Sequence, residues 1–329
     1  MTVLHAGIAT FLGAPHVPPE RAALEAAGAT AAVIGLPYDS TSVTRPGASH
    51  GPRAMRDASS HFAFGGNYHL DYEVTITDHL SLADCGDVNG VPGNPATSYD
   101  RAEAALEEIY AAGCFPVLLG GDHGTTIPGI RAFARHYPGK VGFVMFDTHL
   151  DTAEEIDGED LSHCSPVHRA LDLPNVDGRN VVIIGAHGAA NPRSEVDVAE
   201  QHGVNVFTVR DIERLGIDEV ARAAIALAEE GTEAVYLSVD IDVLDGGFAW
   251  GTCGPEIGGM TGRELVRGLM IVGSGRVEAM DCVEIAPIYD PSGNTARIGA
   301  RVVIDVLAGR ALRLGNRPGP IDNNQREVA

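Results

Sequence analysis

The segment at residues 141–152 constrains the fold of this chain more than any other stretch. Its first half, residues 141–146, is an uncharged apolar run, which is typical of a strand buried on both faces of a parallel sheet. Its second half carries Asp147, His149 and Asp151 at alternate positions. Because side chains two apart in a strand share a face, we expect these three to point the same way. Such a group favours a bound cation, and the alternative for so short a pattern is a solvated turn with an incidental histidine.

Two further segments show the same arrangement of an apolar run followed by acidic or imidazole side chains. One run ends in Asp122 and His123, and the other ends in Asp240 and Asp242. In open α/β sheets, ligand sites form outside the carboxyl ends of the strands. Buried carboxylates are rare unless they are paired or bind a metal. The three segments together therefore predict one metal site at the carboxyl edge of a sheet.

Predicted strands alternate with predicted helices through most of the chain. This alternation predicts an α/β fold, with three layers (α/β/α) and a mainly parallel central sheet. The chain shows neither an internal repeat nor a linker, so we expect a single domain over residues 1–329. It would include an N-terminal extension at residues 1–30 and a polar tail at 315–329, free or laid as an arm on a neighbouring subunit. Strands are expected at residues 31–36, 80–84, 116–123, 141–146, 181–185, 204–209, 235–242 and 277–285, and helices at 18–27, from 51 onward, 98–112, 127–136, 161–171, 217–230, 261–271 and 292–308.

Composition and charge limit the partners of this chain. The formal net charge is −22, which disfavours nucleic acid and anionic membranes and would attract cationic ligands; ordinary acidic solubility explains the charge equally well. No apolar run reaches the roughly 18 residues that span a bilayer, and no signal peptide is evident. Five scattered cysteines without a C-x-x-C pair are typical of a reducing compartment, so we expect a cytoplasmic protein.

The three segments resemble the motif blocks of the ureohydrolase family, the arginases and agmatinases. The blocks are residues 120–123 (GGDH), 147–151 (DTHLD) and 238–245 (SVDIDVLD), and the resemblance extends from about residue 30 to about residue 310. Each block is short and unspecific, but the three in this order are highly specific. The resemblance is to the agmatinase-like branch, which includes hydrolases of guanidine or biguanide compounds, and it implies the arginase fold.

The resemblance implies a site for two divalent metal ions. Its ligands would be His123, Asp147, His149, Asp151, Asp240 and Asp242. In this assignment Asp147 and Asp240 bridge the two ions. His123 and Asp151 complete one site, and His149 and Asp242 complete the other. A ligand set dominated by oxygen suits Mn²⁺, whereas Ni²⁺ or Co²⁺ would bind at least as tightly.

The resemblance also assigns catalytic roles to Asp151, His163 and Glu284. Glu284 matches the carboxylate that receives the guanidinium, and its alternative is a surface charge at a strand end. Asp151 would accept a hydrogen bond from the bridging hydroxide. His163 matches a proton shuttle for the leaving amine, although the family's following glycine is Cys164 here, and the proline expected at position 246 is Gly246. Alternatives to His163 are His136, His168 and His187.

The expected substrate is a small cationic guanidino compound. Residues 153–160 (AEEIDGED) carry a run of carboxylates where arginases hold an amino acid head group, so an amine-tailed compound such as agmatine fits better than arginine. A solvated acidic loop is the alternative. Residues 45–48 (RPGA) resemble a family loop near the site mouth, and the roles of Cys164 and Cys253 stay open.

Three functions remain open at this stage. The first is a hydrolase that releases urea from such a compound, including small guanidines and biguanides. The second is a formimino-group hydrolase, and the third is a non-catalytic subunit of a hetero-oligomer. For the hydrolase we expect a homo-oligomer, a trimer or hexamer, with a hetero-oligomer as the alternative.

Overall fold

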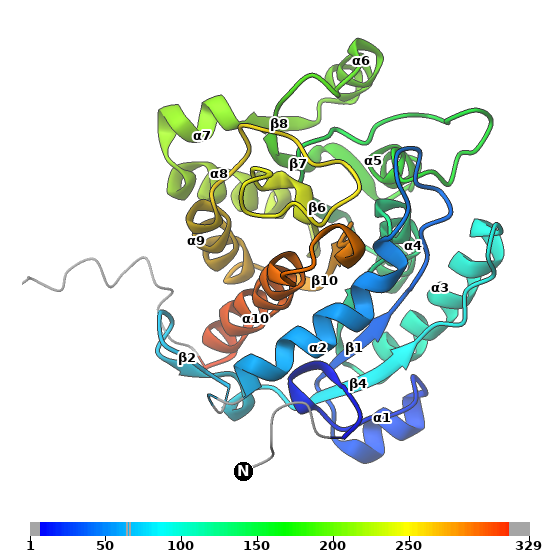
Figure 1. The fold of residues 1–329 in the computed structure, drawn as a ribbon, viewed down its shortest axis with the longest axis vertical. Helices are drawn as coiled ribbons and strands as arrows, with labels where there is room; N and C mark the ends of the chain where they lie inside the picture. The colour runs from blue at the N-terminus through cyan, green and yellow to red at the C-terminus, as the bar shows by residue number, and fades with distance from the viewer. Residues whose placement is uncertain (1–6, 64, 66, 316–329) are drawn as a thin grey trace, which may run out of the picture.

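A parallel sheet forms the centre of the molecule. The computed structural model describes residues 7–63, 65 and 67–315. The sheet has eight strands in the order β4-β1-β5-β10-β9-β6-β7-β8, and each neighbouring pair is parallel (Figure 1). The strands are β1 (Ala31–Gly35), β4 (Leu82–Asp87), β5 (Phe115–Leu119), β6 (Val141–Phe146), β7 (Val176–Ala186), β8 (Asn205–Thr208), β9 (Ala234–Asp240) and β10 (Val277–Val283). The predicted parallel sheet is confirmed.

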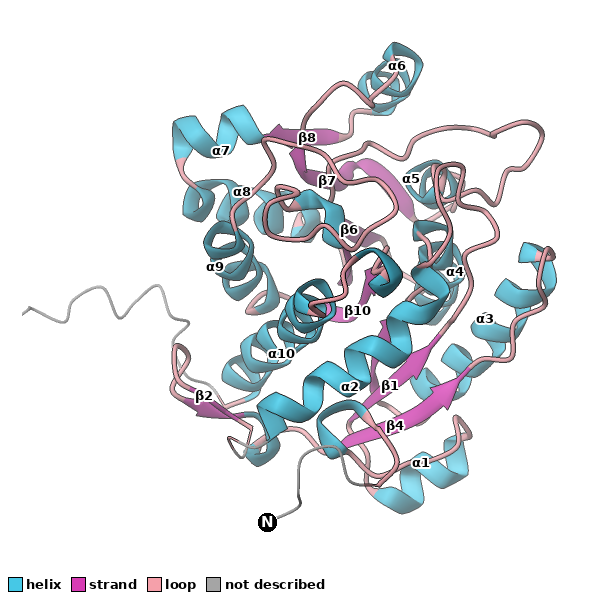
Figure 2. Cartoon of the chain, in the orientation of Figure 1, coloured by secondary structure: helices cyan, strands magenta, loops and turns pink. Residues whose placement is uncertain are grey.

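Helices cover both faces of this sheet, which confirms the predicted three layers (Figure 2). One layer contains α2 (Gly51–Ala63), α7 (Val209–Leu215), α8 (Ile217–Glu229), α9 (Gly262–Gly273) and α10 (Asn294–Leu314). The other contains α1 (Arg21–Ala27), α3 (Pro95–Ala111), α4 (Thr126–His136), α5 (Pro166–Leu171) and α6 (Arg193–His202). None of the helices within the described ranges has the length and apolarity needed to cross a lipid bilayer.

Strand β6 shows why the central run carries no charge. Val144 and Phe146 pack into the core on the side of α8, α9 and α10, whereas Phe143 and Met145 pack into the core on the side of α3 and α4. Successive side chains of a strand point to opposite faces, and here both faces are covered by helices. Every residue of the strand is buried, as the run predicted.

Several elements differ from the predictions. Helix α5 begins at Pro166, five residues later than predicted, because residues 161–165 form turns, in which the backbone oxygen of Cys164 accepts the N–H of Ala153. Helices α6 and α7 were not predicted, nor was the hairpin of β2 (Tyr68–His69) and β3 (Val74–Thr75). Helix α6 buries only Glu195 and Ala199, so it has little apolar periodicity to detect.

The two ends of the chain bear on the predicted organisation. The expected extension contains α1, and Phe11 within it is fully buried and donates its backbone N–H to Asp84 Oδ2 at 2.7 Å. That part of the extension therefore packs against the domain. The predicted tail lies outside the described residues except for Gly315.

The contact between β6 and α8 is tight enough to test. A Cβ atom on Gly142 would lie 2.1 Å from the backbone oxygen of Ala228, so Gly142→Ala forces strand and helix apart. We expect this variant to lose about 1–3 kcal/mol of unfolding free energy, the usual cost of overpacking. Urea denaturation followed by circular dichroism measures the loss.

The matched control is Gly262→Ala in the first turn of α9. There the nearest atom to an added Cβ is 3.8 Å away, and alanine favours helix more than glycine does. We expect no loss of stability in this control. Equal unfolding free energies for the two variants would contradict the close approach of β6 and α8.

Candidate active site

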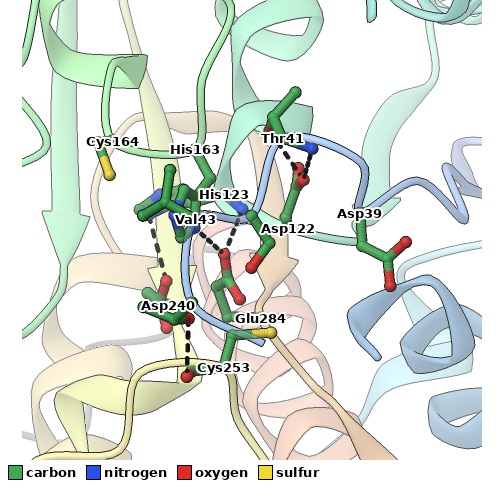
Figure 3. A network of polar contacts seen from close by, with 12 residues as sticks. Asp39, Thr41, Val43, Asp122, His123, His163, Cys164, Asp240, Cys253 and Glu284 are labelled. Carbon is green, nitrogen blue, oxygen red and sulfur yellow. Dashed lines mark hydrogen bonds and ion pairs between the residues drawn. The ribbon is translucent and has the colours of Figure 1, made fainter. Parts of the chain in front are cut away.

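The candidate site lies where four neighbouring strands end. In the sheet order these are β5, β10, β9 and β6, so residues far apart in sequence meet at one edge. His123 follows β5, Glu284 follows β10, Asp240 ends β9, and Asp147 follows β6. Figure 3 shows several of these side chains pointing toward one another from different strands.

The ring of His123 faces three carboxylates. Its Nδ1 lies 2.9 Å from Asp147 Oδ2, 2.8 Å from Asp151 Oδ2 and 3.2 Å from Asp240 Oδ2. All four side chains are buried. Neither His123 Nδ1 nor Asp147 Oδ2 has a hydrogen bond of acceptable geometry within the described residues, so both atoms are left for another partner.

A second imidazole lies on the other side of Asp147. His149 Nδ1 is 3.4 Å from Asp147 Oδ1 and 3.3 Å from Asp242 Oδ2. Two groups of side chains therefore have atoms close enough to hold metal ions, and they share Asp147. The groups are His123, Asp147 and Asp151, and Asp147, His149 and Asp242. All six residues predicted as ligands come together in the folded chain.

The reason given for their convergence was wrong. Strand β6 ends at Phe146, and Asp151 has a φ of 49°, so strand alternation does not align the three side chains. A local turn brings the first two together instead: Asp147 Oδ1 accepts the N–H of His149 at 2.6 Å. Asp240 Oδ1 accepts the N–H of Asp242 at 2.8 Å in the same way. In both segments the carboxylate of the first aspartate accepts the backbone N–H of the residue two positions later.

His123 is oriented from behind by a chain of hydrogen bonds. Its Nε2 lies 3.0 Å from Ser238 Oγ, which donates to Asp281 Oδ1 at 2.6 Å. The serine oxygen is thereby left to accept the Nε2 proton, and a neutral ring then presents the Nδ1 lone pair to the carboxylates. A lone pair that faces carboxylate oxygens requires a cation or a second proton between them. The donor set therefore fits metal ions, as the sequence predicted.

Burial has a large effect on these carboxylates. It raises the pKa of Asp242 to about 6, against the opposing effect of His149. Burial and the neighbouring Asp242 and Asp147 raise the pKa of Asp240 well above its ordinary value. Like charges at this density repel one another, and a divalent cation removes the repulsion.

Glu284 lies beside this cluster with one oxygen unused. Its side chain is 2% exposed. Oε1 accepts the backbone N–H of His123 at 2.8 Å and lies 3.0 Å from His163 Nδ1. Oε2 makes no hydrogen bond of ordinary geometry within the described residues, and the thiol of Cys253 lies beside the carboxylate. Burial favours its protonated form, but His163 and other donors keep the pKa of Glu284 below its ordinary value. The backbone φ of 62° is strained for a non-glycine residue, which is common at functional sites.

Both ring nitrogens of His163 are engaged. Nδ1 faces Glu284, and Nε2 accepts the backbone N–H of Val43 at 3.0 Å (Figure 3). Burial lowers the pKa of His163, but Cys164 and Glu284 raise it to about 12. The N–H of Val43 acts in the opposite sense, because it requires a lone pair on Nε2. We take the ring as neutral in this geometry, since a second proton would point at that N–H.

Residues 41–45 form a loop across His163. Thr41 donates its N–H and its Oγ1 hydroxyl to Asp122 Oδ2 at 3.0 and 2.8 Å, so Asp122 fixes the geometry of this loop. Thr44 donates to the backbone oxygen of Cys253 at 3.0 Å. Arg45 donates to the backbone oxygen of Thr252 at 2.8 Å. Arg45, the first residue of the segment 45–48 that resembles a family loop, thus connects that segment to the one containing Cys253.

The other histidines considered for proton transfer have different partners. His168 Nδ1 lies 3.0 Å from the backbone oxygen of Thr152, and His187 Nδ1 lies 2.8 Å from that of Gly185. His136 is exposed and stacks on Tyr110. Of the four histidines, His163 is the one that contacts Glu284 in the described part of the chain.

Sequence reasoning missed three supporting residues: Ser238, Asp281 and Asn191. Ser238 lies two positions before Asp240 in β9, and Asp281 is a carboxylate inside an apolar strand. A polar side chain in a buried strand needs a partner, so the sequence could have indicated a supporting role for both. Asn191 lies in a loop of no recognisable pattern and carried none.

Known proteins share this fold and much of this sequence. The Arginase family model matches residues 29–309. The chain is 35% identical over 309 residues to guanidinopropionase of Pseudomonas aeruginosa, covering 92% of this chain and 91% of the relative. It is 36% identical over 288 residues to the mitochondrial agmatinase of Gallus gallus, covering 86% and 81%. The solved structure of proclavaminate amidino hydrolase from Streptomyces clavuligerus superposes with a TM-score of 0.85 at 31% identity, covering 95% of this chain and 100% of that one.

The fold and these relatives define a hydrolase that acts on carbon–nitrogen bonds of amidines. The chain belongs to the arginase family, the ureohydrolases, as the motif blocks predicted.

Metal ions should stabilise the folded chain. Adding Mn²⁺ to metal-free protein relieves the repulsion between buried carboxylates, and at a hundredfold excess over Kd it would contribute about 2.7 kcal/mol. We expect a higher Tm by differential scanning calorimetry. Asp147→Ala removes the carboxylate shared by both groups and is expected to show little of this gain. The same rise in that variant, or no rise in the natural protein, would contradict a metal site here.

Proposed function

We propose that this protein hydrolyses a cationic guanidino compound and releases urea at a site that binds two divalent metal ions. The support is the set of six converging ligands and the unused oxygen of Glu284 beside them. Membership of the arginase family and the names of the relatives agree with this reaction class.

Each ion would have its own ligands and share two others. One would be held by His123 and Asp151, the other by His149 and Asp242, with Asp147 and Asp240 shared between them. Mn²⁺ is the proposed metal because oxygen ligands predominate, and Ni²⁺ and Co²⁺ also fit such ligands. Two such ions bound together lower the pKa of a water molecule enough to supply hydroxide at neutral pH.

The buried oxygen of Glu284 carries the substrate assignment. An ionised carboxylate with a free, water-excluded oxygen requires a charged donor, and a guanidinium presents N–H groups in the geometry that carboxylates accept. Glu284 would bind that edge and hold the guanidino carbon next to the metal ligands. The strain at Glu284 is then explained by the orientation that binding requires.

The remaining step requires proton transfer. Water adds its oxygen to the guanidino carbon, the bond from that carbon to the substituted nitrogen breaks, and the products are urea and an amine. The water loses a proton and the departing nitrogen gains one. Asp151 lies among the metal ligands and would accept the first proton, which then returns to solvent. His163, next to Glu284, would take up a proton at Nε2 when that atom is released from the N–H of Val43, and it would deliver this proton to the amine and return to the neutral ring.

His163→Ala tests the assignment of the proton donor. We expect turnover to fall by roughly 10²–10⁴, the usual contribution of general acid–base catalysis, with an unchanged number of metal ions per chain. Steady-state urea release and elemental analysis measure the two quantities. His136→Ala is the control, because this exposed histidine lies at the far end of α4 and should leave turnover unchanged. Loss of metal in His163→Ala would make His163 a ligand, and normal turnover would exclude proton transfer.

The nature of the substrate's tail is the finer part of the proposal. We propose an amine-tailed compound such as agmatine, on the strength of the acidic loop at 153–160. Glu154 and Glu155 are exposed, however, so solvent screens them, and each contributes about 0.2–1 kcal/mol to a charge pair. That is less than a partly desolvated pair would supply.

A compact guanidine is the second candidate, and one observation favours it. Glu284 is almost fully buried, and residues 41–45 cross the site beside it, tied down through Thr41, Thr44 and Arg45. Space next to Glu284 is therefore restricted, which suits a small guanidine or biguanide. Neither a formimino-group hydrolase nor a non-catalytic subunit is better supported.

A substrate panel separates the two candidates. Glu154→Gln and Glu155→Gln should each raise KM for agmatine by up to several-fold with kcat little changed, because a uniform binding contribution is lost. The KM and kcat for guanidine and methylguanidine should stay the same in both variants. Preference of the natural protein for the smallest guanidines would establish the compact alternative. Preference for a carboxylate-tailed compound would contradict both.

The remaining predictions concern the cellular setting. We propose a homo-oligomer that works in the cytoplasm without nucleic acid or membrane partners, on the support of the family resemblance, the net charge and the cysteine pattern. Size-exclusion chromatography with light scattering measures the subunit count.

A further inference from the structure

The two imidazoles of the site are held in different ways. His123 is buried, and its Nε2 is fixed by Ser238. The ring of His149 is 24% exposed, and in the described part of the chain it makes no hydrogen bond or ion pair beyond those with Asp147 and Asp242. Its position must therefore come from the backbone that carries it.

The backbone around His149 lies outside the sheet. Residues 147–152 follow the end of β6, and Asp151 adopts a φ of 49°, which costs of order 1–3 kcal/mol in a non-glycine residue. Such a conformation persists where surrounding contacts impose it. Some of these contacts come from the segment at residues 160–170, where the N–H of Val167 donates to the oxygen of Asp151 at 3.0 Å. Others come from the loop after β7, at residues 187–192, and from the first turn of α6.

Asn191 in that loop holds the peptide groups on both sides of His149. Its Oδ1 accepts the N–H of Leu150 at 3.0 Å, and its Nδ2 donates to the oxygen of Thr148 at 3.1 Å. The same Nδ2 donates to the oxygen of His187 at 2.8 Å, which ties the side chain to its own loop. One amide thus brackets the metal-facing histidine from before and after.

Glu195 continues the clamp toward Asp151. Its Oε2 accepts the N–H of Thr152 at 3.3 Å, and its backbone oxygen accepts from Thr152 Oγ1 at 2.8 Å. The two residues therefore hold different parts of the segment: Asn191 holds the backbone on both sides of His149, and Glu195 holds Thr152, which follows Asp151.

We propose that Asn191 is a positioning residue for the metal ion that His149 binds. It acts through the backbone of Thr148 and Leu150, which sets the direction of the His149 ring toward Asp147 and Asp242. Loss of Asn191 weakens this ion selectively, because His123 and its ion keep their own support from Ser238 and Asp281. The inference rests on the two-ion site of the proposed function.

The test is an Mn²⁺ titration of the full chain, with bound ions per chain measured by equilibrium dialysis and elemental analysis. In Asn191→Ala we expect one ion to bind 10–100-fold more weakly, as is usual when a supporting partner of a ligand is lost, and the other to change little. In His149→Ala, adding Asn191→Ala should produce no further loss, because the two residues act on the same ion.

Asn175→Ala is the matched control. Its Nδ2 also makes three hydrogen bonds to backbone oxygens, those of Ala134, Tyr137 and Gly139, at 2.9–3.1 Å and away from the site. This variant should lose comparable stability and bind both ions with the affinity of the natural protein.

The outcomes separate the two proposals. Two ions bound to Asn191→Ala with natural affinity, or an equal weakening of both, overturns the positioning role and leaves the proposed function standing. An additional loss in the double variant also overturns it. Failure of the natural protein to bind two ions overturns the proposed function and the positioning role together.

Discussion

The close packing of four buried carboxylates with two imidazoles governs the functional end of this molecule. Asp147 lies between both histidines, with one oxygen facing each, and it belongs to both candidate metal groups. Removing so many charges from water without compensation would cost several kcal/mol for each ion. The folded arrangement is therefore one that a pair of divalent cations completes.

The order of the strands makes this concentration of charge achievable. β5, β10, β9 and β6 are neighbours in the sheet although they are widely spaced in the chain, and their carboxyl ends open on one edge. The apolar bodies of these strands are buried on both faces and hold the edge rigid. Each functional side chain then needs only a short turn to reach the centre, as the paired turns at Asp147 and Asp240 show.

Loops from other parts of the chain fix the positions of the side chains in the site. In the loop at residues 41–45, Val43 contacts His163, and in the loop after β7, Asn191 holds the backbone around His149. Of the six non-glycine residues with positive φ in the described part of the chain, Asp151 and Glu284 lie in the site. Strain at these positions is sustained by tertiary hydrogen bonds, so the geometry depends on the whole fold rather than on local preference.

Much of the fold could be predicted from the residues alone, as could the edge of the sheet at which the acidic and imidazole side chains converge. Uncharged strands that end in Asp or His indicated the sheet and its functional edge. Burial on both faces excludes charged side chains from the strands, whereas a metal site requires acidic or imidazole side chains at their ends. Helix α9 was predicted at residues 261–271, and Thr261 caps it in the structure. Helix α6 was missed because it is mostly exposed, and the start of α5 was misplaced because residues 161–165 form turns before the helix begins. The contact of His163 with Val43 spans 120 positions, that of Glu284 with His163 spans 121, and those of Asn191 with Leu150 and Thr148 span 41 and 43, and no local pattern encodes any of them. Chain folding alone brings those groups together, and their geometry therefore belongs to the tertiary structure.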